Sequence, residues 1–240
     1  MARHWSELTA DPNSSVAREH RRKTLEHARA EPVSDRVAYL CGLARGKKVL
    51  DIGVVDHELN SRPGEVWLHG EIAKAGKSVL GVDILPKAVE DLKARGYNVL
   101  LRDVTADPLD EKFELITCGE VIEHLGNPGG LLKAARKMLL PGGRLVLTTP
   151  NPYFASRVRD SVTGRFHESV DHVTFLFPSG VAELAEREGL MLDKFQGILT
   201  TRARRPWGKL QMAWSRATKP VASLERFCRS MIFEVVLPDN

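Results

Sequence analysis

The stretch Lys48–Gly53 constrains the fold more than any other part of the sequence, because an apolar run ends abruptly in an acid and a glycine. Val49, Leu50 and Ile52 suit a short central strand of a parallel sheet that helices cover on both faces. Gly53 lets the backbone turn sharply beside a ligand. In such sheets, ligands bind at the carboxyl ends of the strands. The stretch therefore predicts the first strand of a nucleotide-binding α/β domain.

Further strand patterns follow and alternate with helical stretches. The predicted strands span 78–83, 97–101, 113–118, 144–148, 191–198 and 231–237. The predicted helices after the first strand include 86–95, 128–139 and 178–188, and a tight turn is expected at 140–143. Strands separated by helices predict a parallel sheet with right-handed crossovers. We therefore assign residues 45–200 to an α/β core.

The residues before the first strand, 1–44, are predicted to form an N-terminal helical cap. The stretch 15–30 has a helical pattern but is heavily charged, which favours a solvated helix. A second helix over 33–44 carries Val37 and Leu40 toward the core. The cap is thus expected to pack on the core mainly through its second helix.

Composition excludes several classes of protein. The hydrophobic fraction of 42% and the charged fraction of 28% are those of an ordinary soluble globular protein. No apolar run approaches the ~20 residues that span a bilayer, and the N-terminus lacks a signal-peptide core, so we expect a cytoplasmic protein. Three separated cysteines, Cys41, Cys118 and Cys228, argue against a disulfide framework and a CxxC-type zinc site.

The net charge of +4 is concentrated near the end of the chain. Residues 202–229 contain eight Arg or Lys and a single acid, Glu225, interleaved with Trp207 and Trp214. We assign 201–229 to a basic, amphipathic helical insertion and 230–240 to the final strand of the core. Three interpretations stay open for the insertion: a lid bordering the acceptor pocket, which we expect, a peripheral membrane contact, or an RNA contact.

The series VLDIG, VLGVDI, LRDVTA, FELITCGEVIEHL and LLPGGRLVLTTPNP resembles the class I S-adenosylmethionine-dependent methyltransferases over about residues 45–200. Five motifs in the right order are far more specific than one glycine-rich loop. The resemblance implies an α/β, Rossmann-like, doubly wound sheet of seven strands, mostly parallel. It also implies that the last strand is antiparallel and inserted beside the sixth.

The resemblance implies S-adenosylmethionine as the cofactor. The residues that it implies for cofactor binding are Asp51, Gly53, Asp83, Ile84, Asp103, Val104 and Gly119. The role implied for Asp83 suits its chemistry, because a carboxylate at a strand end can accept two hydrogen bonds from a ribose diol. Val55 and His57 depart from the family, which commonly has glycines there. Either binding is weaker, or the loop containing Trp67 and His69 closes over the site in its own way.

A possible metal constellation follows the fourth strand. If Glu120 begins a helical turn, it faces the same point as Glu123 and His124, and His172 can join from a later loop. Such ligands suit a hard or borderline divalent ion such as Mg²⁺. The arrangement resembles the small-RNA 3′-end 2′-O-methyltransferases and the ubiquinone-pathway O-methyltransferases, in which a metal can hold the acceptor hydroxyls. A general-base role for His124 or His172 is the alternative.

These observations predict an enzyme that transfers a methyl group to a hydroxyl of a small molecule, such as a sugar, a glycan precursor or a natural product. An RNA 2′-O-methyltransferase and a non-catalytic binding protein with a methyltransferase-like fold are the alternatives. The acceptor pocket is expected from residues 1–30 and 150–177, which carry no recognisable code for one acceptor. The sequence indicates no oligomeric state.

Overall fold

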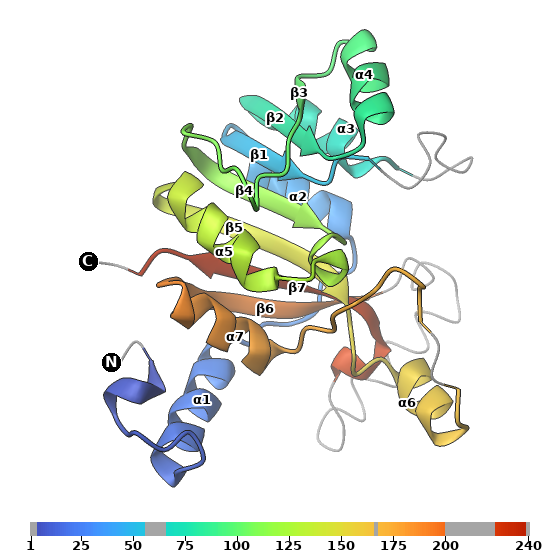
Figure 1. Cartoon of the computed structure of the whole chain (residues 1–240). Coiled ribbons are helices and arrows are strands. Elements are labelled where there is room, and N and C mark those ends of the chain that lie inside the picture. Colours follow the sequence, from blue (N-terminus) through green and yellow to red (C-terminus); the bar gives the residue numbers. More distant parts are fainter. Residues whose placement is uncertain (1–3, 56–65, 166–167, 200–223, 239–240) are drawn as a thin grey trace.

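The structure, a computed structural model, describes residues 4–55, 66–165, 168–199 and 224–238. Its strands are β1 (Lys48–Ile52), β2 (Ser78–Asp83), β3 (Val99–Leu101), β4 (Phe113–Gly119), β5 (Leu139–Pro150), β6 (Met191–Leu199) and β7 (Cys228–Val236). They form one seven-stranded sheet in the order β3-β2-β1-β4-β5-β7-β6 (Figure 1). β7 pairs antiparallel with both β5 and β6, while β1 to β5 run parallel. The predicted doubly wound, Rossmann-like α/β fold with an inserted antiparallel last strand is confirmed.

Helices cover both faces of the sheet. They are α1 (Ser15–Ala28), α2 (Arg36–Ala44), α3 (Leu68–Ala75), α4 (Pro86–Ala94), α5 (Pro128–Met138), α6 (Ala155–Val162) and α7 (Pro178–Arg187). Single turns of 3-10 helix form η1 (Trp5–Glu7), η2 (Ile122–His124) and η4 (Leu224–Phe227). The main apolar cluster joins α5 and α7 to one face, and a second cluster joins α2 and α3 to the other. Strands covered on both faces explain the nearly continuous apolar runs in the sequence.

Local sequence signals set the ends of several helices. Ser14 and Asp35 each accept a hydrogen bond from a backbone N–H three residues later, which begins α1 and α2. Pro86 and Pro128 stand in the first turns of α4 and α5, where a missing N–H has no cost. Because α2 leads directly into β1, its first residue, Arg36, lies toward the carboxyl ends of the strands.

The tight turn predicted at 140–143 is wrong, because these residues lie inside β5, which begins at Leu139. The pairing of β5 with β4 shifts register between Phe113 and Leu115, so the glycines form an irregularity within the strand. Gly142 has φ +74°, and a Cβ on Gly143 would lie 2.9 Å from the carbonyl oxygen of Leu140. The bulge in β5 therefore requires glycine at these positions. For this reason the composition of residues 140–143 resembles that of a turn.

Two predicted features lie largely outside the described residues. These are the loop that contains His57 and most of the basic insertion at 201–229. The final strand begins at Cys228, inside the span assigned to the insertion. None of the helices in the described part of the chain has the length and apolar character needed to cross a bilayer.

Candidate active site

The parallel strands bring the predicted cofactor residues to one edge of the sheet. β1 pairs with β2 and β4, and β2 pairs with β3, all in parallel, so their carboxyl ends meet. The sheet order reverses direction between β1 and β4, which is where α/β sheets of this kind bind ligands. The predicted residues at these ends are Asp51, Gly53, Asp83, Ile84, Asp103, Val104 and Gly119.

Gly53 is required by close packing as well as by backbone conformation. Its φ of +76° lies in the left-handed region, and a Cβ there would lie 2.2 Å from Cγ2 of Val121. Val121 directly precedes η2, so the absence of a side chain at Gly53 lets the segment after β4 lie against the end of β1. The edge of the sheet where the carboxyl ends of β1, β2, β3 and β4 meet is called the cofactor edge below. Gly53 thus brings this edge close to the turn that carries Glu123 and His124.

Asp83 is held by backbone amides at the end of β2. Its Oδ1 accepts from the N–H of Ile84 at 2.8 Å and of Leu85 at 3.1 Å, and its Oδ2 accepts from the N–H of Val55 at 3.0 Å. The carboxylate is therefore fixed although Val55 replaces a family glycine. The side chain of Ile84 is 66% exposed beside it.

Asp103 and Val104 contribute differently after β3. Hydrogen bonds from the hydroxyl and backbone N–H of Thr105 hold the pKa of Asp103 below its usual range, so the exposed carboxylate stays ionised. The Val104 side chain is buried in the main apolar cluster. Only the backbone of Val104 is therefore available at the sheet edge.

Asp51 is buried and interacts with side chains of other elements. Thr117 on β4 donates to its Oδ1 at 2.6 Å, and Nδ1 of His69 on α3 lies 2.9 Å from its Oδ2. Among the described residues, no backbone N–H donates to this carboxylate. Asp51 and Asp83 thus stand at the ends of adjacent strands but are positioned by different kinds of donor.

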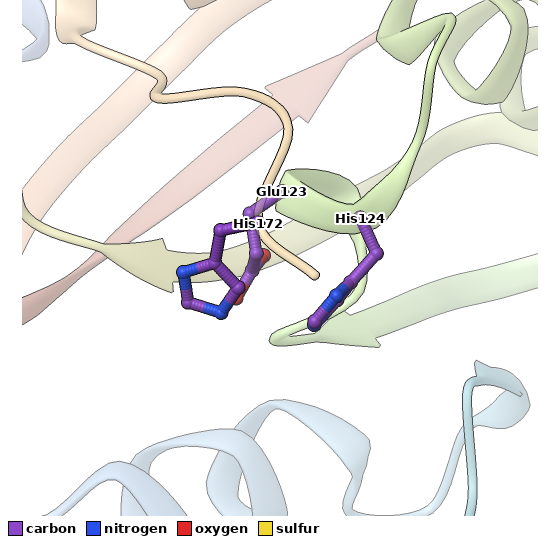
Figure 2. A group of neighbouring side chains, drawn as sticks. All are labelled: Glu123, His124 and His172. Atoms are coloured by element: carbon purple, nitrogen blue, oxygen red, sulfur yellow. The ribbon is translucent and has the colours of Figure 1, made fainter. Parts of the chain in front are cut away.

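Glu123, His124 and His172 form a compact group beyond β4. One ligand atom from each lies within 4.8 Å of the others, and the two imidazole centroids are 4.9 Å apart. Figure 2 shows the three side chains extending toward the same space, two from the turn η2 and one from the loop before α7. The structure therefore brings together three of the four residues predicted as metal ligands.

Backbone hydrogen bonds bring His172 to the group. The carbonyl oxygen of Glu123 accepts from the N–H of Val173 at 3.0 Å and of Thr174 at 3.1 Å. His124 Nδ1 lies 3.2 Å from both the carbonyl and a carboxylate oxygen of Asp171. If Nδ1 donates to these oxygens, Asp171 fixes the orientation of the His124 ring.

Glu123 is the buried carboxyl of the group. Its side chain is 1% exposed, and Thr149 donates to Oε2 at 3.1 Å. Burial, with a smaller contribution from the neighbouring charge of Glu120, raises the pKa of Glu123 to about 7. In the part of the chain that the structure describes, Glu123 Oε1 and His172 Nδ1 are buried without a hydrogen-bond partner. A buried polar atom without a partner destabilises the folded state, so binding of a cation or a proton by these two atoms would remove that cost.

Glu120 does not join the group, because the turn begins at Ile122 and does not include it. Glu120 has φ +55°, in the left-handed region, and its carboxylate lies 3.4 Å from the guanidinium of Arg36. Arg36 also lies 3.5 Å from the Thr148 hydroxyl. Sequence reasoning missed Arg36, since one arginine among many in the helical cap carries no distinguishing signal. The left-handed backbone conformation of Glu120 is strained, and backbone strain of this kind often marks functional sites.

We expect Glu123→Gln to stabilise the metal-free protein at pH 8. The folded-state pKa of about 7 lies above the ordinary glutamate value of 4.5, so the folded state holds a proton that the unfolded state releases between these pH values. Stability from this group is therefore present at low pH and is lost as pH rises toward 7. Glutamine removes that loss, and the expected gain at pH 8 is about 1–3 kcal/mol.

Urea unfolding in EDTA at pH 5 and pH 8 measures this effect. The exposed Glu90→Gln on α4 is the matched control, because it makes the same chemical change outside the buried group. Equal stability of Glu123→Gln and the wild type at both pH values would show that burial does not perturb this carboxyl.

Residues 25–194 match the family described as Methyltransferase domain. The chain belongs to this family. The ubiquinone biosynthesis O-methyltransferase of Cupriavidus pinatubonensis is 27% identical over 214 residues, covering 82% of this chain and 77% of the relative. The enzyme of the same name from Acinetobacter baumannii is 30% identical over 172 residues, covering 65% of this chain and 68% of the relative.

Solved methyltransferases share the fold. The magnesium protoporphyrin IX methyltransferase of Synechocystis, solved with bound SAH, has a TM-score of 0.56 at 17% identity over 98% of this chain and 93% of its own. An S-adenosylmethionine-dependent methyltransferase from Archaeoglobus fulgidus has a TM-score of 0.56 at 16% identity, covering 83% and 90%. The predicted membership of the class I S-adenosylmethionine-dependent methyltransferase superfamily is confirmed.

Proposed function

We propose that this methyltransferase transfers a methyl group from S-adenosylmethionine to a hydroxyl of a small molecule. The observation that carries the proposal is the group of Glu123, His124 and His172 beside the cofactor edge, which offers a carboxylate and two imidazoles to an acceptor hydroxyl. Relatives named as O-methyltransferases support the same reaction class. S-adenosylmethionine supplies an electrophilic methyl group, so the protein must mainly align the acceptor and accept its proton.

The residues at the strand ends fit the cofactor. Asp83 presents a rigid carboxylate suited to a ribose diol, and Gly53 removes a side chain where backbone must lie close to its neighbours. Arg36 places a guanidinium near the end of β4, where it suits the carboxylate of a methionine group. These features support binding of the cofactor across β1, β2 and β4.

The histidine group can serve the acceptor in two ways. A divalent ion held by Glu123, His124 and His172 would supply Lewis-acid polarisation of the acceptor hydroxyl. The buried unpaired atoms on Glu123 and His172 suit such an ion. Without an ion, an imidazole of the group can accept the hydroxyl proton, and Asp171 orients the ring of His124.

Methyl transfer from radiolabelled S-adenosylmethionine to a panel of catechols, phenols and sugars tests the proposal. We expect label on at least one of these hydroxyl compounds. RNA fragments in the same assay test the RNA alternative. Label only on RNA would replace the small-molecule acceptor. Binding of S-adenosylmethionine without label on any acceptor would favour a non-catalytic binding protein.

A further inference from the structure

Asp51, one of the predicted cofactor residues, forms a buried pair with His69, and the function proposed above assigns no role to His69. Asp51 is 3% exposed and His69 is 2% exposed. Nδ1 of His69 lies 2.9 Å from Asp51 Oδ2, and the Thr117 hydroxyl lies 2.6 Å from Asp51 Oδ1. In the tautomer with its proton on Nδ1, His69 donates this hydrogen bond to Asp51. Each oxygen of Asp51 is thus held by a side chain from another element.

The position of the imidazole is itself built by several elements. Trp67 donates from Nε1 to the carbonyl of Val54 at 2.8 Å. The centroid of its ring lies 5.2 Å from that of His69 and 4.8 Å from that of Tyr97. A Cβ on Gly81 would lie 2.8 Å from Cε1 of His69, so only glycine in β2 leaves room for the ring. A tightly enclosed ring holds its hydrogen bond in one direction.

Asp51 and Asp83 differ in how they are held. Backbone N–H groups fix Asp83, including that of Val55. Among the described residues, the side chains of Thr117 and His69 hold Asp51. A buried carboxylate needs such donors to remain ionised. His69 is therefore one of the two described side chains that set the orientation of the Asp51 carboxylate.

The location of Asp51 gives this carboxylate a ligand to face. Asp51 lies on β1, next to β4, where the sheet order reverses, and Gly53 follows two positions later. The methionine portion of S-adenosylmethionine carries a cationic ammonium and a cationic sulfonium. An anion at this strand end attracts that portion of the cofactor and has no corresponding charge to attract in adenosine.

We propose that His69 is a positioning residue for S-adenosylmethionine, holding the Asp51 carboxylate as an oriented anion for the cationic methionine end of the cofactor. The inference rests on the cofactor of the proposed function and adds a residue to its binding machinery. His69 acts through Asp51 and does not contact the transferred methyl group. If His69 has this role, loss of its hydrogen bond to Asp51 weakens binding of a ligand that contains the methionine portion more than binding of one that lacks it.

Calorimetric titration of His69→Asn and His69→Gln tests the proposal. The Asn amide places its donor where Nδ1 stands, whereas the Gln amide places it further out, so the two variants differ in donor position but not in donor type. The ligands are S-adenosylmethionine and 5′-methylthioadenosine, which keeps the adenosine portion and lacks the ammonium, the carboxylate and the sulfonium charge. Thermal melting of each variant establishes that it is folded.

We expect His69→Gln to raise the Kd for S-adenosylmethionine about tenfold or more, and the Kd for 5′-methylthioadenosine less than about threefold. His69→Asn should stay within about threefold of the wild type for both ligands. Should His69→Gln not fold, Thr117→Val removes the other donor and carries the same expectation.

Two results would overturn the role of His69. One is unchanged S-adenosylmethionine affinity in His69→Gln, and the other is an equal loss for both ligands, which indicates a general structural effect. A wild type that binds neither ligand would instead overturn the cofactor assignment. The two failures are therefore separated by the wild-type titration alone.

Discussion

Chelation of divalent ions is expected to lower methyl transfer by roughly a hundred-fold or more, since even indirect support of a metal ligand is worth 10–100-fold. Glu123→Gln, His124→Ala and His172→Ala should each cause about the same loss, and the double variants should lose little more. The reason is that the three residues present one atom each within 4.8 Å, so a bound ion depends on all of them together.

Turnover of each variant, measured after chelation and after return of Mg²⁺ or Mn²⁺, checks this expectation. His27→Ala, an exposed histidine on α1, is the matched control for loss of an imidazole. Glu120→Gln belongs in the series, because the sequence grouped it with the ligands and the structure pairs it with Arg36. Full turnover in chelated wild type, together with inactive histidine variants, would discard the metal and leave the histidines as bases.

Asp83→Ala is expected to weaken S-adenosylmethionine binding by about 1.5–3 kcal/mol, the amount typical of lost charge-assisted hydrogen bonds. The carboxylate stands at the end of β2 with its orientation fixed by three backbone N–H groups, so it is prepared for a ribose diol before the ligand arrives. The sheet should remain folded, because the side chain supports the loop at Val55 and not the strands.

Calorimetric titration of the folded variant measures the change. Asp107→Ala is the matched control, since that acid is exposed and pairs only with Arg102 in the salt bridges of the described residues. An unchanged Kd for Asp83→Ala would remove this residue from the ribose site.

The fold was predictable because each central strand is an apolar run that ends in a polar residue or a glycine. Val49 and Leu50 are fully buried on opposite faces of β1, as a strand covered by helices on both sides requires. The turn predicted at 140–143 failed for a local reason. Proline and two glycines suit a turn and a bulged strand equally well, and only the pairing with β4 decides between them.

The site was predictable in its parts and less so in its assembly. A strand that ends in Asp83 indicates a carboxylate at the sheet edge, and the spacing of Glu123 and His124 places them on one turn. The conformation of Glu120 and the approach of Arg36 depend on contacts between elements distant in sequence. Such contacts follow from three-dimensional packing and leave no periodic signal in the chain.

The antiparallel strand β7 has a consequence for how the protein is made. It is the last strand in the sequence, yet it pairs with β5 on one side and β6 on the other. During synthesis, a chain that has produced β6 but not β7 therefore leaves the edges of β5 and β6 that β7 will cover unpaired and available to another nascent chain. The sheet closes only when residues 228–236 have left the ribosome, so aggregation of intermediates is the hazard of this topology.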